Sequence, residues 1–184
     1  MIHDQDRSGW FGASDTYQIM GNWHTNTFYA WWMEKCGLRR NLIKTPAMMA
    51  GTMYEHAVLR KIGIRKVDRQ IKMKSLRLRV NLDGEDRNTI YEVKTHMHPF
   101  AVSKRYWMQA QVEMFAAKKE LVIVAYHLPE EAYDNFFLPI VAQEITYHPI
   151  SYDGSWIEQE YLPRLKYLGN CLRDKTTPIQ GVSR

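Results

Sequence analysis

Residues 80–95 read V-N-L-D-G-E-D-R-N-T-I-Y-E-V-K-T, and this stretch decides the fold. Apolar and polar side chains alternate over 76–81, which predicts a strand that ends at Asp83-Gly84. Residues 85–88 have the polar chemistry of a turn. The β-branched and aromatic run 89–95 predicts a second strand. The stretch therefore predicts an antiparallel hairpin.

The hairpin brings three charged side chains toward one point. Glu92 and Lys94 lie two residues apart, so they leave the same face of their strand, and Asp83 on the first strand can approach them. Carboxylates at an open site favour Mg²⁺ or Mn²⁺, and a neighbouring lysine can orient or deprotonate a bound water. A polar hairpin with a surface ion pair is the alternative, because so short a motif recurs by chance.

Length and composition are those of a single globular domain, residues 1–184, of which 45% are hydrophobic and 24% charged. Two cysteines, Cys36 and Cys171, cannot supply a four-cysteine metal site or a disulfide framework. No apolar run approaches the roughly 20 residues of a membrane span, and the N-terminus has no signal-peptide pattern. We therefore expect a cytoplasmic protein without a membrane partner.

Positive charge is concentrated in one segment. Residues 60–79 hold nine basic residues and one acid, whereas the whole chain has a net charge of +5. A basic segment next to a carboxylate hairpin fits a polyanionic substrate. A solvated strand face explains the same charges equally well.

Helix signals precede the hairpin. Ser14 or Asp15 would cap a short helix that ends at Gly21, and Arg7 nearby makes its N-terminus a candidate anion site, with a plain cap as the alternative. The aromatic run Thr25–Cys36 predicts a second, core-facing helix.

A third helix is expected to begin at Thr45-Pro46 and to run to about Ile62. It places Glu55 in a mostly apolar stripe, where a bound cation could partner its carboxylate.

The segment after the hairpin predicts a helix over Phe100–Lys119 that bears Tyr106, Gln109 and Glu113 on one edge and Gln111 elsewhere. The loop histidines His96 and His98 could bind a transition metal, although ordinary loop histidines are commoner.

Further strands and a closing helix complete the expected architecture, an α/β (α+β) fold with a mixed central sheet flanked by helices. The expected ranges are a hairpin over Ile64–Asp83, strands over Glu120–Leu128 and Phe137–Tyr147, and a helix from a capping box at Ser155–Glu158 to about Arg173, kinked or restarted at Pro163.

Four motifs together resemble the PD-(D/E)XK nuclease superfamily and, within it, the phage lambda-type exonuclease or YqaJ-like viral recombinase branch. The likeness covers roughly residues 7–128. The motifs are R-x-x-x-x-x-A-S-D at Arg7, Ala13, Ser14 and Asp15, G-x-x-Y-E at Gly51, Tyr54 and Glu55, D…E-x-K at Asp83, Glu92 and Lys94, and Y-x-x-Q-x-Q at Tyr106, Gln109 and Gln111.

The resemblance implies a restriction-endonuclease-like core and a role for each matched residue. Asp83, Glu92 and the Val93 carbonyl would hold one Mg²⁺, and Glu55 would help to hold a second. Lys94 would activate water. A 5′-phosphate and DNA would be bound by Arg7, Ser14, Tyr106, Gln109 and Gln111.

The activity implied is digestion of one strand of linear duplex DNA in the 5′→3′ direction from a 5′-phosphorylated end, in recombination or repair. The branch includes ring-shaped trimers and partners of single-strand annealing proteins. This chain is short for the branch, and Leu82 stands where proline often precedes the aspartate.

Two other functions are compatible with the motifs. One is a structure-specific endonuclease of the same fold. The other is a non-catalytic DNA-binding or assembly protein, for which the full set of carboxylates and lysine would be unnecessary.

Overall fold

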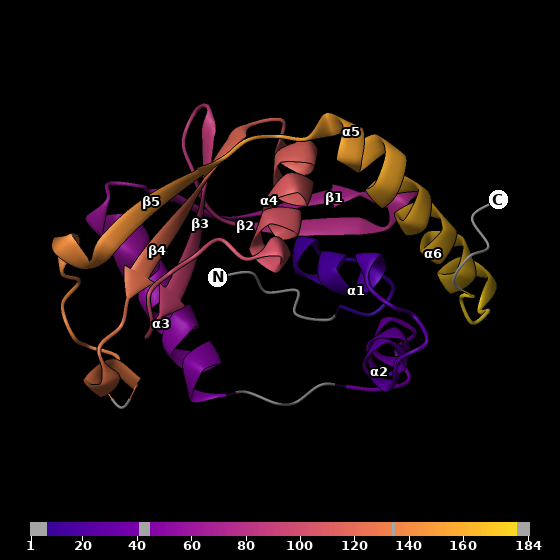
Figure 1. Ribbon diagram of the computed structural model, residues 1–184, viewed down its shortest axis with the longest axis horizontal. Coiled ribbons are helices and arrows are strands. Elements are labelled where there is room, and N and C mark those ends of the chain that lie inside the picture. Colours follow the sequence, from indigo (N-terminus) through magenta and orange to yellow (C-terminus); the bar gives the residue numbers. More distant parts are fainter. Residues whose placement is uncertain (1–6, 41–44, 134, 180–184) are drawn as a thin grey trace.

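The computed structural model describes residues 7–40, 45–133 and 135–179 (Figure 1). A five-stranded mixed sheet in the order β1-β2-β3-β4-β5 forms the centre, with helices on both faces. The strands are β1 Lys66–Met73, β2 Leu78–Glu85, β3 Thr89–His96, β4 Glu120–His127 and β5 Ile145–Ile150. The helices are α1 Thr16–Met20, α2 Asn26–Lys35, α3 Pro46–Lys61, α4 Lys104–Ala117, α5 Gly154–Trp156 and α6 Leu162–Asp174.

Strand pairing confirms the predicted meander. The β1–β2 and β2–β3 pairs are antiparallel, whereas β3 and β4 are parallel and are joined through α4. The described register pairs β2 with β3 only beside the turn, at Gly84–Tyr91 and Glu85–Ile90. The strands therefore fork at Asp83, and the fork leaves room for side chains between them.

Two apolar clusters hold the helices to the sheet. One joins Val80, Ile90 and Ile123 to α4 and to the aromatic side chains of α2, and the other joins Val93 and Val124 to α3. Because Ile90 and Val93 belong to different clusters, β3 is buried on both faces. The fork at Asp83 is thus held between α3 and α4. None of the helices in the described ranges is long and apolar enough to cross a membrane.

Local signals explain most helix starts. The hydroxyls of Thr25 and Thr45 accept the backbone N–H of Phe28 and Met48, as expected for N-caps, and Pro46 follows as the first residue of α3.

The predicted helix over Phe100–Lys119 is correct in kind, but it begins four residues later than expected. The hydroxyl of Ser103 caps it by accepting the Tyr106 N–H.

Two predicted caps and one strand are wrong. Asp15 does not cap α1, because its carboxylate accepts the N–H of Gly12 and binds Lys35. The last helical segment is capped by Asp153 rather than by Ser155. The strand predicted over Phe137–Tyr147 is β5, which begins only at Ile145.

The closing helix is interrupted as expected near Pro163. A π-helical turn, Ile157–Tyr161, separates α5 from α6, and the proline stands in the first turn of α6.

Candidate active site

The fork between β2 and β3 gathers the three charged residues of the hairpin. Asp83 Oδ2 accepts the backbone N–H of Val93 at 2.9 Å, which fixes it beside β3. Lys94 Nζ donates to Glu92 Oε1 at 2.6 Å, and these two side chains are 18% and 5% exposed. The convergence of Asp83, Glu92 and Lys94 predicted from the hairpin is confirmed.

Helix α4 adds a polar row to this cluster. Gln109 Nε2 donates to Glu92 Oε1 at 2.6 Å and to Glu113 Oε1 at 2.8 Å. The ammonium of Lys94 lies 5.0 Å from the ring centroid of Tyr106. Glu113 is fully buried, and the sequence placed it on this edge without a role. Its position four residues after Gln109 was the available signal.

Three carboxylates of the cluster have raised pKa values, because burial and repulsion between them outweigh the positive charge of Lys94. Burial and then the charge of Glu92 raise the pKa of Glu55 to about 7. Burial, followed by the charges of Glu92 and Glu55, raises the pKa of Asp83 well above its usual range. Burial and the charge of Glu92 also raise the pKa of Glu113. Burial opposes the charge of Lys94, but Glu92 and Asp83 nevertheless raise the pKa of its ammonium.

The donor set fits a divalent cation. Glu92 Oε1 receives hydrogen bonds from Lys94 and Gln109, whereas Glu92 Oε2 is buried and receives none from a described donor. Glu113 Oε2 is likewise buried and receives no hydrogen bond from a described donor. A buried carboxylate is costly to keep charged, so these oxygens favour either a proton or a cation, and hard oxygen ligands of this kind suit Mg²⁺ or Mn²⁺.

A cleft of about 560 Å³ connects this cluster to the N-terminal segment. Arg7 and Ser14 line it together with Asp83 and Glu92. Lys35, Arg60 and Arg79, which the sequence analysis did not assign to the site, also line it. The cleft therefore has an acidic part at the fork and basic side chains around it.

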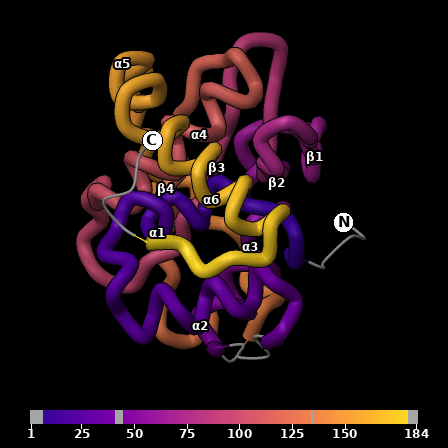
Figure 2. Tube along the Cα trace, turned by 90° about the vertical axis from the view of Figure 1, so that its right-hand side faces the viewer, coloured from indigo at the N-terminus to yellow at the C-terminus, as the bar shows by residue number. Residues whose placement is uncertain are grey.

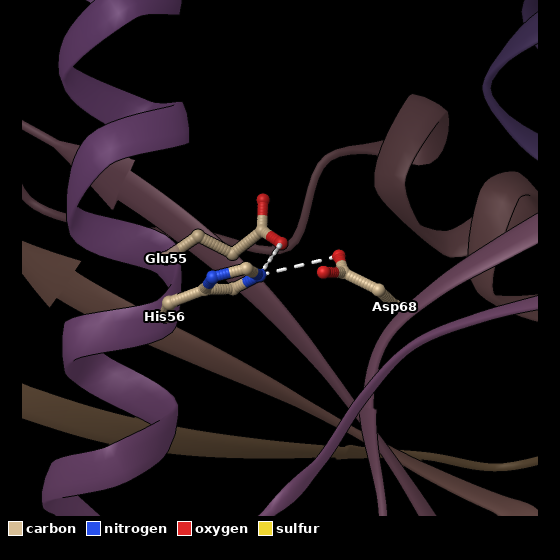
Figure 3. Close-up of side chains that lie close together, drawn as sticks. All are labelled: Glu55, His56 and Asp68. Carbon is tan, nitrogen blue, oxygen red and sulfur yellow. Dashed lines mark hydrogen bonds and ion pairs between the residues drawn. The ribbon is translucent and has the colours of Figure 1, made fainter. Parts of the chain in front are cut away.

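A second group of ligand atoms lies where α3 faces β1 (Figure 3). His56 Nε2 is 3.2 Å from Asp68 Oδ1 and 3.9 Å from Glu55 Oε1. Asp68 adopts a φ of 58°, which is uncommon for a residue other than glycine. The sequence analysis assigned no role to His56 or Asp68, although Asp68 is the single acid among residues 60–79. Glu55 thus belongs to this group and also lies close enough to Glu92 and Asp83 for their charges to interact.

Three predicted residues lie outside the cluster. Both ends of the Gln111 amide are used by the loop before α5, since it donates to the Ser151 carbonyl and accepts the Asp153 N–H. His96 Nδ1 lies 2.6 Å from the His98 carbonyl oxygen. The two histidines do not belong to the group of metal-ligand atoms found in the described residues.

Comparison with known proteins gives a likeness in fold. No family model matches the chain, and no curated protein sequence does. An alkaline exonuclease (LHK-Exo) from Laribacter hongkongensis superposes with a TM-score of 0.69 at 19% identity, over 92% of this chain and 90% of that one. A second structure, SSO0001, reaches a TM-score of 0.48 at 11% identity, over 98% of this chain and 81% of that one. This chain thus shares its fold with the alkaline exonuclease, and the mixed sheet flanked by helices expected from the sequence is confirmed.

Proposed function

We propose that this chain is a Mg²⁺-dependent DNA nuclease that digests one strand of linear duplex DNA in the 5′→3′ direction from a 5′-phosphorylated end. The observation that carries the proposal is the convergence of Asp83, Glu92 and Lys94 at the fork, with one oxygen of Glu92 left without a donor. The fold shared with an alkaline exonuclease supports it.

Two Mg²⁺ ions, or Mn²⁺ in their place, fit the carboxylates of the fork. Asp83, Glu92 and the Val93 carbonyl would hold the first ion, and Glu55 with Asp83 would hold the second. Bound there, the ions would neutralise charge on the scissile phosphate and would acidify water. The remaining steps fall to the side chains of this chain.

Lys94 would orient the attacking water and offset negative charge that develops on the phosphate. Its ammonium is held by Glu92 at 2.6 Å, and the neighbouring carboxylates raise its pKa. It therefore acts first as a proton donor and a positive charge. Gln109 fixes Glu92 from the other side, and Glu113 fixes Gln109.

The basic part of the cleft suits the terminal phosphate. Arg7 and Ser14 line it on the side of the N-terminal segment, and Arg79 lies among them. Gln109 contributes only if one of its hydrogen bonds to Glu92 or Glu113 is released, because both are formed in this structure. Tyr106 lies against the ammonium of Lys94, but it is not among the described residues that line the cleft.

The test uses linear duplex DNA labelled separately on each 5′ end, with Mg²⁺ or EDTA, beside a covalently closed circle. We expect Mg²⁺-dependent release of the 5′ label as mononucleotides, an intact circle, and slower release from 5′-hydroxyl ends. Asp83→Asn should abolish release, whereas the exposed Glu120→Gln control should retain it. Cutting of the circle would indicate the endonuclease, and binding without cleavage would indicate the assembly protein.

A ring-shaped trimer and a single-strand annealing partner stay predictions from the sequence resemblance. Their tests are the mass of the protein in solution and co-purification with a co-expressed annealing protein.

A further inference from the structure

A second cavity lies beside the cleft and is strongly basic. It has a volume of about 520 Å³ and lies between α6, the 3₁₀ turn Lys74–Leu76 and the N-terminal segment. In Figures 1 and 2, α6 passes close to the end of the β1–β2 hairpin, and it contacts the 3₁₀ turn. The cationic side chains of Lys74, Arg77, Lys166 and Arg173 line the cavity.

The cavity is not neutralised from within. No aspartate or glutamate is among its described lining residues. Arg173 is paired with Asp174 at 2.9 Å, but no described carboxylate forms an ion pair with Lys74, Arg77 or Lys166. A concave surface with three cations that no described carboxylate neutralises concentrates anions, because its positive potential adds up where the side chains converge.

Trp10 connects the cavity to the candidate active site. Trp10 is a lining residue of both the cleft that contains Asp83 and the basic cavity. The ammonium of Lys72 lies 5.9 Å from the centroid of the same ring. An indole between two basic surfaces offers a face on which a base can stack. Its position indicates one continuous path rather than two separate sites.

We propose that the basic cavity binds the sugar–phosphate backbone of the same DNA whose end enters the cleft, with Trp10 between the two contacts. The proposal rests on DNA as the substrate of the proposed function. A cavity of this volume admits a nucleotide-sized segment, whereas a lone phosphate would fill little of it. The contact carries no sequence information and acts as an anchor.

The test measures DNA binding in EDTA, so it does not depend on cleavage. The variant is Lys74→Ala/Lys166→Ala, because both lysines are exposed and neither forms a described ion pair. The control, Arg87→Ala/Lys118→Ala, removes the same charge from exposed positions that line neither cavity. Binding of a 5′-phosphorylated duplex is followed by fluorescence anisotropy over a salt series.

We expect the variant to bind the duplex about tenfold more weakly at low salt than the control does. The slope of log affinity against log salt should fall in magnitude by roughly 1.8, since two phosphate contacts to a duplex are lost. Equal affinity and slope in variant and control would overturn the proposal. If the variant binds the duplex as the control does, but inorganic phosphate no longer weakens that binding, the cavity is a site for a small anion. This outcome would also overturn the proposal.

The outcome separates the two proposals. If Mg²⁺-dependent cleavage fails but the variant still loses binding, the anchor stands and the nuclease does not. If cleavage is found and the variant binds like the control, the nuclease stands and the anchor does not.

Discussion

Glu85 is the residue whose replacement should most clearly show how β2 is held in place. Its side chain is fully buried, yet it receives three cations. Lys119 Nζ lies 2.6 Å from Oε2, Arg69 Nη1 lies 2.9 Å from the same oxygen, and Lys66 also pairs with the carboxylate. Because Lys119 follows α4 and the other two belong to β1, this one carboxylate ties three segments together next to the fork.

The magnitude follows from the pKa. Burial alone would raise the pKa of Glu85, but hydrogen bonds from Lys119, Lys66 and Arg69 lower it from 4.5 to about 2. That difference corresponds to about 3 kcal/mol. Because Lys66 and Arg69 are 62% and 42% exposed and are screened by water and salt, we expect about 2 kcal/mol.

The sign of the pH dependence is determined by the direction of this shift. Since the pKa in the folded protein lies below its ordinary value, the stabilisation is present above about pH 4.5. It is lost as the pH falls from about 4.5 to about 2. Glu85→Gln resembles the protonated carboxyl, so it should cost about 2 kcal/mol at pH 7 and progressively less below about pH 4.5.

Urea denaturation followed by tryptophan fluorescence, repeated over this pH range, measures the difference between the wild type and the variant. The exposed Glu130→Gln serves as the control and should leave the free energy of unfolding unchanged. A loss that is the same at pH 7 and near pH 2 would refute the electrostatic account, because packing alone would then explain it. No loss at pH 7 would refute the role of Glu85 altogether.

Two further predictions concern charge in the interior. At about a hundredfold excess over its dissociation constant, Mg²⁺ should stabilise the protein by about 2.7 kcal/mol and raise Tm by about 5–10 °C in calorimetry. Asp83→Asn should abolish this rise in Tm. An equal rise in that variant would contradict the assignment of Asp83 as a metal ligand. Lys35 Nζ lies 2.5 Å from the carboxylate of Asp15, so Lys35→Met leaves this carboxylate buried without its cation. The free energy of unfolding, measured in urea, should fall by about 3 kcal/mol. A loss under 1 kcal/mol would show that the hydrogen bonds from Trp31 and Gly12 suffice to hold the carboxylate.

The elements that could be predicted from sequence are those whose signals are local. Thr45-Pro46 determines the start of α3 because a cap and a fixed φ act within one turn. The alternation of apolar and polar residues before Asp83 determines β2, because this pattern is also local in the sequence. The start of β5 could not be obtained this way, because residues 137–144 lie in a loop and one 3₁₀ turn, with Phe137 exposed, before the chain pairs with β4 from Ile145.

The candidate site follows the same division. Glu92 and Lys94 share a face by strand geometry alone, and their contact was predicted. Asp68 could not be placed, because its approach to His56 depends on how β1 packs against α3. Gln111 shares a motif with Gln109, but only the tertiary fold shows that its amide braces the loop before α5.

Asp83 and Glu85 lie two residues apart on β2, but their pKa values are shifted in opposite directions. Glu85 meets three cations, which lower its pKa, whereas the pKa of Asp83 is raised by burial and by the charges of Glu92 and Glu55. Because the same strand contains a fully compensated carboxylate, the undercompensated one is not a general property of the region. The undercompensated charge is confined to the fork, where Lys94 provides the one ammonium, among the described residues, that donates a hydrogen bond to Glu92. Such a local deficit of positive charge destabilises the empty site and is the condition under which a divalent cation binds tightly. The contrast between these two neighbours therefore supports a metal-dependent reaction at Asp83 more strongly than the motif does alone.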